Sequence, residues 1–143
     1  MKATAFLNLA QRLLTNEKNA AGLRSAISRA YYAAFHETSD FLKRIGCQVP
    51  DDATGHKKAY FYLNNCNDDP LIEAAAYLDN LHGDRNEADY DLTAQRVEKE
   101  PIAQNVVATA EKVIKALDEC NKSDQRKKDV AMAVQAYKQQ NKM

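Results

Sequence analysis

The feature that most constrains this chain is one long amphipathic segment, from Asn19 to about Ile45. Mostly apolar side chains recur there every three or four residues and draw one continuous stripe along a helix: Ile27, Ala30, Tyr31, Ala34, Thr38, Phe41, Leu42 and Ile45. Polar side chains occupy a different face of the same helix: Arg29, Tyr32, His36 and Asp40. A helix with such a stripe needs partners that cover it, so we expect the rest of the chain to pack around it.

The remaining segments also have helical periodicity, and no sustained alternation typical of strands is present. We expect helices over about 3–14, 56–64, 69–83 and 101–120, a helical turn from Arg85, a charged connector at 122–128 and a weaker amphipathic tail helix around 130–137. The sequence therefore predicts an all-α, up-and-down bundle of about five helices with an extra C-terminal helix or tail. The bundle is assigned to residues 1–120 and the tail to 121–143.

Glycine, proline and short polar residues mark the expected helix ends. Asn19 is expected to cap the long helix, and Gly46 to end it. Asp69 with Pro70 is expected to start the next long helix, and Gly83 to stop it. Asp84 and Glu87 then have the spacing of a capping box, which would begin a new helix at Arg85. Gly22 lies inside the long helix, where it is expected to cost about 1 kcal/mol relative to alanine.

Charge and cysteine content exclude several classes of protein. Lys plus Arg and Asp plus Glu balance at 20 each, so any nucleic-acid contact must come from a local basic patch. Three dispersed cysteines fit neither a disulfide framework nor a zinc site. No signal-peptide pattern or long apolar run is present, so we expect a cytoplasmic protein without membrane association. No metal or other cofactor is expected either, because the three histidines are dispersed and no P-loop, GxGxxG or GxSxG motif occurs.

Two polar groups are candidates for a functional site. The first is Arg29, Tyr32 and His36, which could bind phosphate and supply an acid or base, or could satisfy buried carboxylates such as Asp89. Arg29 and His36 stand roughly 10 Å apart along the helix. The second is the segment from His82 to Leu92, which could hold an anion or could be a structural clip in which Arg85 pairs with Asp89 and Tyr90 packs. His56 is a further possible phosphate contact.

These motifs together resemble the HEPN domain superfamily. The resemblance rests on Arg24-Ser-Ala-Ile-Ser-Arg-Ala-Tyr-Tyr-Ala-Ala-Phe-His36, on Gly55-His-Lys57 and on Arg85-Asn-Glu-Ala-Asp-Tyr-Asp-Leu92 after Leu81, in that order, over roughly residues 1–120. Within that superfamily, the sequence is similar to a branch of small proteins that carry an S-R-A-Y-Y-A-x-F-H helix and a later R-x-x-A-D-Y signature. The resemblance implies a homodimer, a role in prokaryotic defence or toxin–antitoxin systems, and a minimal nucleotidyltransferase as possible antitoxin partner.

Many HEPN proteins are metal-independent endoribonucleases with an Arg-x4–6-His motif at a dimer cleft. Here Arg85 matches the arginine, but no histidine follows it. We therefore expect a module that binds nucleic acid or a nucleotide, with an endoribonuclease toxin that cleaves RNA as the alternative. The candidate catalytic residues are Arg85, Asp89, Tyr90 and His36, and the candidate binding residues are Arg29, Tyr32, His56, His82 and Asn86.

Overall fold

The chain is all-α in a computed structural model that describes residues 1–142. Its helices are α1 (Thr4–Asn16), α2 (Ala20–Arg44), α3 (Gly55–Asn64), α4 (Asp69–Tyr90), α5 (Glu100–Asn121) and α6 (Asp124–Gln140), with a short 3₁₀ turn, η1 (Arg96–Glu98), before α5. The predicted fold class is confirmed. Within the described range no helix has the length and apolar character needed to cross a membrane.

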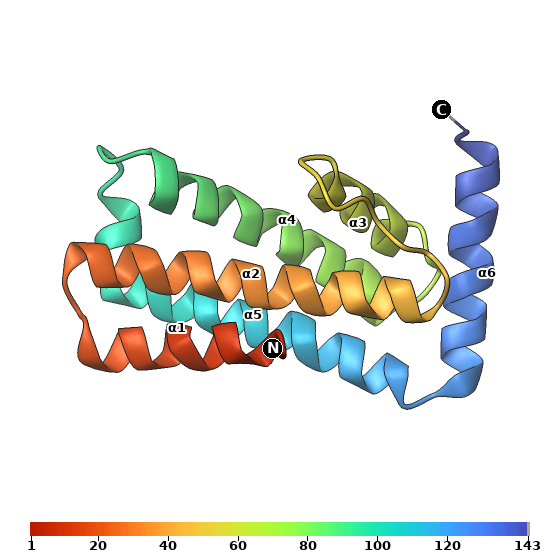
Figure 1. Ribbon diagram of the computed structural model, residues 1–143, viewed down its shortest axis with the longest axis horizontal. Helices are drawn as coiled ribbons and strands as arrows, with labels where there is room; N and C mark the ends of the chain where they lie inside the picture. The colour runs from red at the N-terminus through yellow and green to blue at the C-terminus, as the bar shows by residue number, and fades with distance from the viewer. Residues whose placement is uncertain (143) are drawn as a thin grey trace.

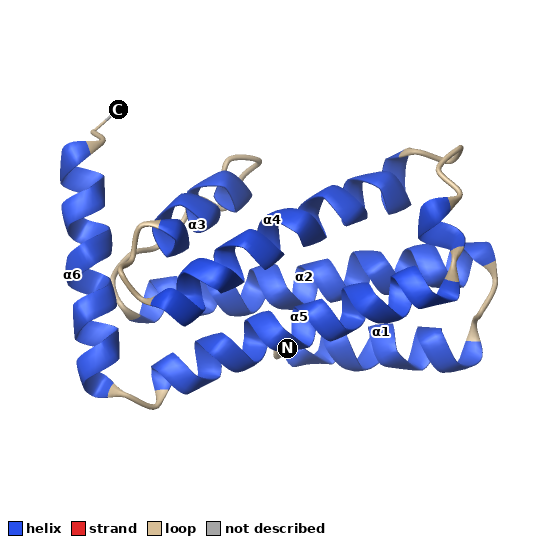
Figure 2. Ribbon diagram, turned by 180° about the vertical axis from the view of Figure 1, so that it is seen from behind, coloured by secondary structure: helices blue, strands red, loops and turns tan. Residues whose placement is uncertain are grey.

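Four long helices form the body of the molecule and alternate in direction. Figure 1 shows α1, α2, α4 and α5 running along the long axis, with α2 between its neighbours and in contact with each of the other three. The short helix α3 lies on α4, and α6 crosses the end of the bundle at a steep angle (Figure 2). The arrangement is an up-and-down bundle extended by α3 and by the C-terminal helix.

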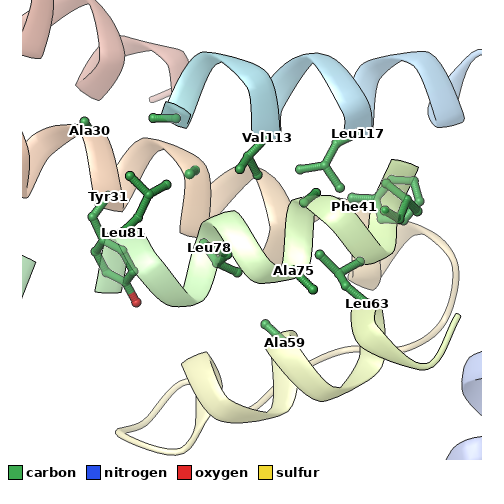
Figure 3. Packing of buried hydrophobic residues seen from close by; sticks show 14 of the residues in the cluster. Ala30, Tyr31, Phe41, Ala59, Leu63, Ala75, Leu78, Leu81, Val113 and Leu117 are labelled. Atoms are coloured by element: carbon green, nitrogen blue, oxygen red, sulfur yellow. The ribbon is translucent and has the colours of Figure 1, made fainter. Parts of the chain in front are cut away.

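The apolar stripe predicted on α2 is the centre of the core. Ile27, Phe41 and Leu42 are essentially inaccessible to solvent, and Ile45 at the end of the stripe is half-buried. Figure 3 shows how α3, α4 and α5 each add side chains to the same interior, among them Ala59, Leu63, Ala75, Leu78, Leu81, Val113 and Leu117. Many of these side chains are small, which lets the helices approach closely.

The ends of α2 follow the prediction, but Gly22 does more than expected. The side chain of Asn19 accepts a hydrogen bond from the backbone N–H of Gly22 at 2.8 Å, and Gly46 has a positive φ of 82° just after the helix. A Cβ at position 22 would lie 1.8 Å from the carbonyl oxygen of Glu17. Gly22 is therefore not a weak point but the residue that permits the tight turn between α1 and α2.

The predicted break at Gly83 is wrong, because α4 continues from Asp69 to Tyr90 without interruption. One glycine costs a helix only about 1 kcal/mol, and Leu78, Leu81 and Ala88 keep the buried face continuous on both sides of it. Asp84 does not cap a new helix but accepts a hydrogen bond from Arg96 at 2.6 Å. The N-cap of α4 is Asp68 rather than Asp69.

Arg24 holds the C-terminal end of α4. Its guanidinium donates to the carbonyl oxygens of Glu87, Ala88 and Asp91 at 2.9–3.1 Å and to that of Ala94 at 2.8 Å. It also pairs with Glu98 of η1 at 2.7 Å. Arg24 is only 8% exposed, so a buried cation caps a helix end whose last carbonyls have no partner within the helix.

The C-terminal region is more regular than the sequence indicated. Of the predicted connector 122–128, only Lys122 and Ser123 lie outside helices, and the hydroxyl of Ser123 caps α6. Val130 and Val134 of α6 are buried against the bundle. Arg126 binds the carboxylate of Asp68 through two nitrogens, each at 2.9 Å. The tail helix therefore docks on its own chain.

The three cysteines, Cys47, Cys66 and Cys120, are buried and unpaired, as the sequence predicted. Burial raises the pKa of each thiol, to about 11 for Cys66. Thiols with raised pKa values are weak nucleophiles at neutral pH. We therefore assign the cysteines to the core and not to a site.

Candidate functional site

The candidate site lies where the middle of α2, the start of α3 and the second half of α4 meet. Because α4 is continuous, Asp79, His82 and Arg85 follow one another at three-residue spacing along one face. That face meets Tyr31 of α2 and His56 of α3. Three segments that are distant in sequence thus place one arginine, two histidines and a tyrosine together.

His56 and His82 form the centre of this group. Their rings stack with centroids 3.7 Å apart and an angle of 17° between the planes. The Nδ1 of His56 lies 3.1 Å from the hydroxyl of Tyr31, and its Nε2 lies 3.5 Å from a carboxylate oxygen of Asp79. We assign the proton of neutral His56 to Nε2 from these two partners, so that Nδ1 accepts from Tyr31. The imidazole of His82 forms no hydrogen bond within residues 1–142.

Arg85 lies against aromatic rings. Its Cζ is 5.3 Å from the ring centroids of Tyr31 and Tyr32 and 5.7 Å from that of Tyr90. The side chain is 14% exposed, and its nearest carboxylate oxygen, on Asp89, is 4.0 Å from Nε. Nε is buried and has no hydrogen-bond partner among residues 1–142. The rings fix the plane of the guanidinium but leave a donor free.

The predicted row on α2 adjoins this group through Tyr32. The ring of Tyr32 lies 6.0 Å from that of His36, and the Cζ of Arg29 is 5.1 Å from the Tyr32 ring. Phe6 of α1 contacts both ends of the row, with the Arg29 Cζ 5.4 Å and the His36 ring 5.7 Å from its centroid. Arg29 and His36 are thus linked by aromatic rings.

The electrostatics of the site keep its histidines neutral. Burial lowers the pKa of His56, and Arg85 lowers it further, while the hydrogen bond and charge of Asp79 oppose this shift. Burial also lowers the pKa of His82, and the neighbouring His56 and Arg85 add to the effect. The pKa of Tyr31 is raised, mainly by burial, with Arg85 opposing. At neutral pH the site therefore contains one arginine cation, two neutral imidazoles and a protonated phenol, beside the carboxyl group of Asp79.

The other candidates lie at the margin of the site. Asp89 accepts a hydrogen bond from Ser28 at 3.1 Å, and not from Arg29 or His36 as one alternative had it. Tyr90 is 75% exposed and its hydroxyl accepts from Arg85 at 3.4 Å, so it does not pack in the core. Asn86 is exposed and forms no side-chain hydrogen bond within the described part of the chain.

Three members of the site were not among the sequence candidates: Tyr31, Asp79 and Phe6. The sequence placed Tyr31 in the buried stripe, and its side chain is indeed buried. Its hydroxyl, however, lies within hydrogen-bonding distance of His56. Asp79 could have been linked to His82 and Arg85 by its three-residue spacing, but the break expected at Gly83 placed it on a separate helix from Arg85. Phe6 carries no sequence signal for this role, because its position depends on how α1 packs against α2.

Over residues 1–142 the structure contains no cluster of three or more histidine, cysteine or acidic side chains that could hold a metal ion. No family model matches the chain, and no curated protein or solved structure matches it either. The HEPN resemblance therefore rests on the sequence motifs described above.

Proposed function

We propose that this protein is a HEPN-like module that binds single-stranded RNA or a nucleotide at Arg85. The observation that carries the proposal is the state of the Arg85 side chain, which is held against three tyrosine rings while its buried Nε has no hydrogen-bond partner. A buried donor without a partner costs about 1–3 kcal/mol. A phosphate would bind at the terminal nitrogens of the guanidinium, whose geometry it matches, because Nε itself is closed to solvent.

The surroundings of Arg85 favour a nucleotide over a bare anion. Tyr90 is 75% exposed and Tyr32 is half-buried, so both offer ring surface on which a base can stack. His82 has free ring nitrogens that can donate to or accept from a ribose or a base. Because the histidines are neutral, Arg85 provides the positive charge of the site.

The experiment is fluorescence anisotropy with a labelled oligouridylate of about 12 nucleotides, since binding sites for single strands commonly span about 4–16 nucleotides. We expect Arg85→Ala to weaken binding by about tenfold or more, as loss of a charge-assisted phosphate contact does. Arg12→Ala is the matched control, because Arg12 is exposed on α1. Thermal unfolding of each variant shows whether the bundle is intact. Wild-type affinity in folded Arg85→Ala would contradict the proposal.

A second candidate is metal-independent cleavage of RNA, and a specific observation favours it. His82 is one turn from Arg85, has a lowered pKa and has no hydrogen-bond partner within the described residues. A neutral imidazole can take the proton of a ribose 2′-hydroxyl. The 2′-oxygen would then attack phosphorus, and the 5′-oxygen would leave with the proton returned by the imidazolium. Arg85 would stabilise the charge on the phosphoryl oxygens.

Incubation of the protein with transfer RNA and messenger RNA in the presence of a metal chelator tests this second candidate. Cleavage should leave a 2′,3′-cyclic phosphate and a 5′-hydroxyl, and His82→Gln should abolish it while oligouridylate still binds. Arg12→Gln is the control, because Arg12 is exposed on α1 and is not among the candidate site residues. No cleavage by folded wild-type protein would leave RNA binding as the function.

The HEPN resemblance also carries our proposals on assembly and setting. We propose a homodimer that acts in a prokaryotic defence or toxin–antitoxin system, with a minimal nucleotidyltransferase as partner. Light scattering on the purified protein measures the assembly directly, and a monomeric mass at high protein concentration would contradict the dimer. Co-purification with a co-expressed nucleotidyltransferase from the same operon tests the partner.

A further inference from the structure

A second concave surface lies between α3 and α6, at the end of the molecule. It is a groove of about 190 Å³ whose charged and aromatic lining residues are Lys58, Phe61, Tyr62, Tyr137, Lys138 and Lys142. Figure 1 shows α6 standing beside the C-terminal end of α3, which explains why residues about 75 positions apart line one groove. Among residues 1–142, no acidic residue lines it.

The charges of this groove are free for a ligand. In a chain with 20 basic and 20 acidic residues, a surface whose described lining residues include three lysines and no acidic side chain is a local excess of positive charge. Within the described part of the chain, the lysines that form ion pairs are Lys18, Lys122 and Lys127, none of which lines the groove. This is the local basic patch that a neutral chain needs for contact with a polyanion.

Aromatic rings lie between these lysines. Lys138 Nζ is 5.7 Å from the centroid of Tyr62, and the Tyr62 ring meets the Tyr137 ring edge-on at 6.5 Å. On the α3 side, Lys57 Nζ is 5.8 Å from the centroid of Phe61, whose ring is half-buried. Tyr62 is buried, but the half-buried rings of Phe61 and Tyr137 beside these cations suit a strand that presents phosphates and planar bases, which an acidic peptide does not.

We propose that the α3–α6 groove is a second binding site for single-stranded RNA, continuous with the Arg85 site. The inference rests on the proposed function for the identity of the ligand. The connection is α3 itself: His56 belongs to the Arg85 site, and Tyr62 lies six residues further on, roughly 9 Å along the axis at 1.5 Å per residue. At about 100° per residue Tyr62 lies on a different side of α3 from His56, so a strand that contacts both sites has to wrap around α3.

The test compares oligouridylate binding over about 50–200 mM salt, because each phosphate contact in a single strand contributes about 0.7 to the slope of log affinity against log salt concentration. We expect the double variant Lys58→Ala/Lys138→Ala to reduce the slope by about 1.4. Lys115→Ala is the matched control, since Lys115 is exposed on α5 and does not line this groove, and it should leave the slope unchanged.

Stacking is tested separately. Phe61→Leu keeps an apolar side chain on α3, and we expect it to weaken oligouridylate binding by about fivefold or more through loss of base stacking. Ultraviolet cross-linking followed by mass spectrometry should place the RNA on a peptide that contains Phe61 or Tyr137 in wild type. Thermal unfolding confirms that each variant is folded.

The outcomes separate this inference from the proposed function. If the groove variants bind as wild type while Arg85→Ala does not, the groove is not a binding site and the Arg85 site stands. If Arg85→Ala binds oligouridylate as wild type does while the groove variants do not, the groove is a binding site and the proposed binding at Arg85 is wrong. Absence of RNA binding by folded wild type overturns both. Equal competition by polyglutamate for the groove would show a general anion site and overturn the assignment to RNA.

Discussion

His56 and His82 stack with their ring centroids 3.7 Å apart and so join α3 to α4 directly above Tyr31. The Arg85 guanidinium lies near both imidazole rings. Its charge, together with burial, lowers the pKa values of His56 and His82. Protonation of both imidazoles should weaken the stack, because two imidazolium ions in contact beside an arginine repel one another. The protonation state of the site is therefore linked both to stability and to ligand binding.

Stability should fall as the pH drops below the ordinary histidine pKa of about 6.5. A lowered pKa means that the unfolded chain binds protons which the folded site rejects, so the stabilisation is complete above that pH and is lost progressively below it. His82→Gln should reduce this dependence. Urea unfolding between about pH 7.5 and 5.5 measures it, in a range where carboxylates contribute little. His36→Gln is the control, and an unchanged slope in His82→Gln would contradict the argument.

Binding of a polyanion should raise the pKa values of His56 and His82. A phosphate beside Arg85 neutralises the charge that, with burial, lowers both values in the free protein. Titration of the imidazole resonances by NMR, with and without oligouridylate, measures the shift. The same titration in Arg85→Gln should show higher values already in the free protein. No change on binding in wild type would place the strand elsewhere.

Replacement of Arg24 by methionine should destabilise the fold by about 3 kcal/mol, because it removes a buried cation and leaves its acceptors unpaired. The acceptors are four carbonyl oxygens between Glu87 and Ala94 and the partly exposed carboxylate of Glu98. Urea unfolding measures the loss, and Arg12→Met, at an exposed position, should change stability by no more than about 0.5 kcal/mol. A loss in Arg24→Met as small as that of the control would show that the cap is dispensable.

Two glycines in helices should respond to alanine in opposite directions. Gly83→Ala should stabilise the protein by about 0.5–1 kcal/mol, because alanine is the better helix former and no atom lies within 4 Å of the added Cβ. Gly22→Ala should destabilise it, since the added Cβ would lie 1.8 Å from the Glu17 carbonyl oxygen. Melting temperatures of the pair test this. Destabilisation by Gly83→Ala would argue against a continuous α4.

The periodicity of the sequence determined the helices and the buried side of α2. Ile27, Phe41 and Leu42 belong to an apolar stripe along one side of α2. A helix with such a stripe is stable when other helices cover it, and here they do. The Asn19 cap and the Gly46 end were also predictable, because each depends on chemistry within a few neighbouring residues. The sequence was enough to predict these features because the contacts that determine them lie within a few residues of one another.

Only the tertiary structure decided the course of α4 and the composition of the site. Gly83 carries a local signal for a break, but burial of Leu81 and Ala88 on either side and the hydrogen bonds from Arg24 outweigh it. The pairing of His56 with His82 depends on how α3 packs on α4, and that of Phe6 with His36 on how α1 packs on α2. Such contacts join residues that are distant in the chain, and no periodic pattern in the sequence predicts them.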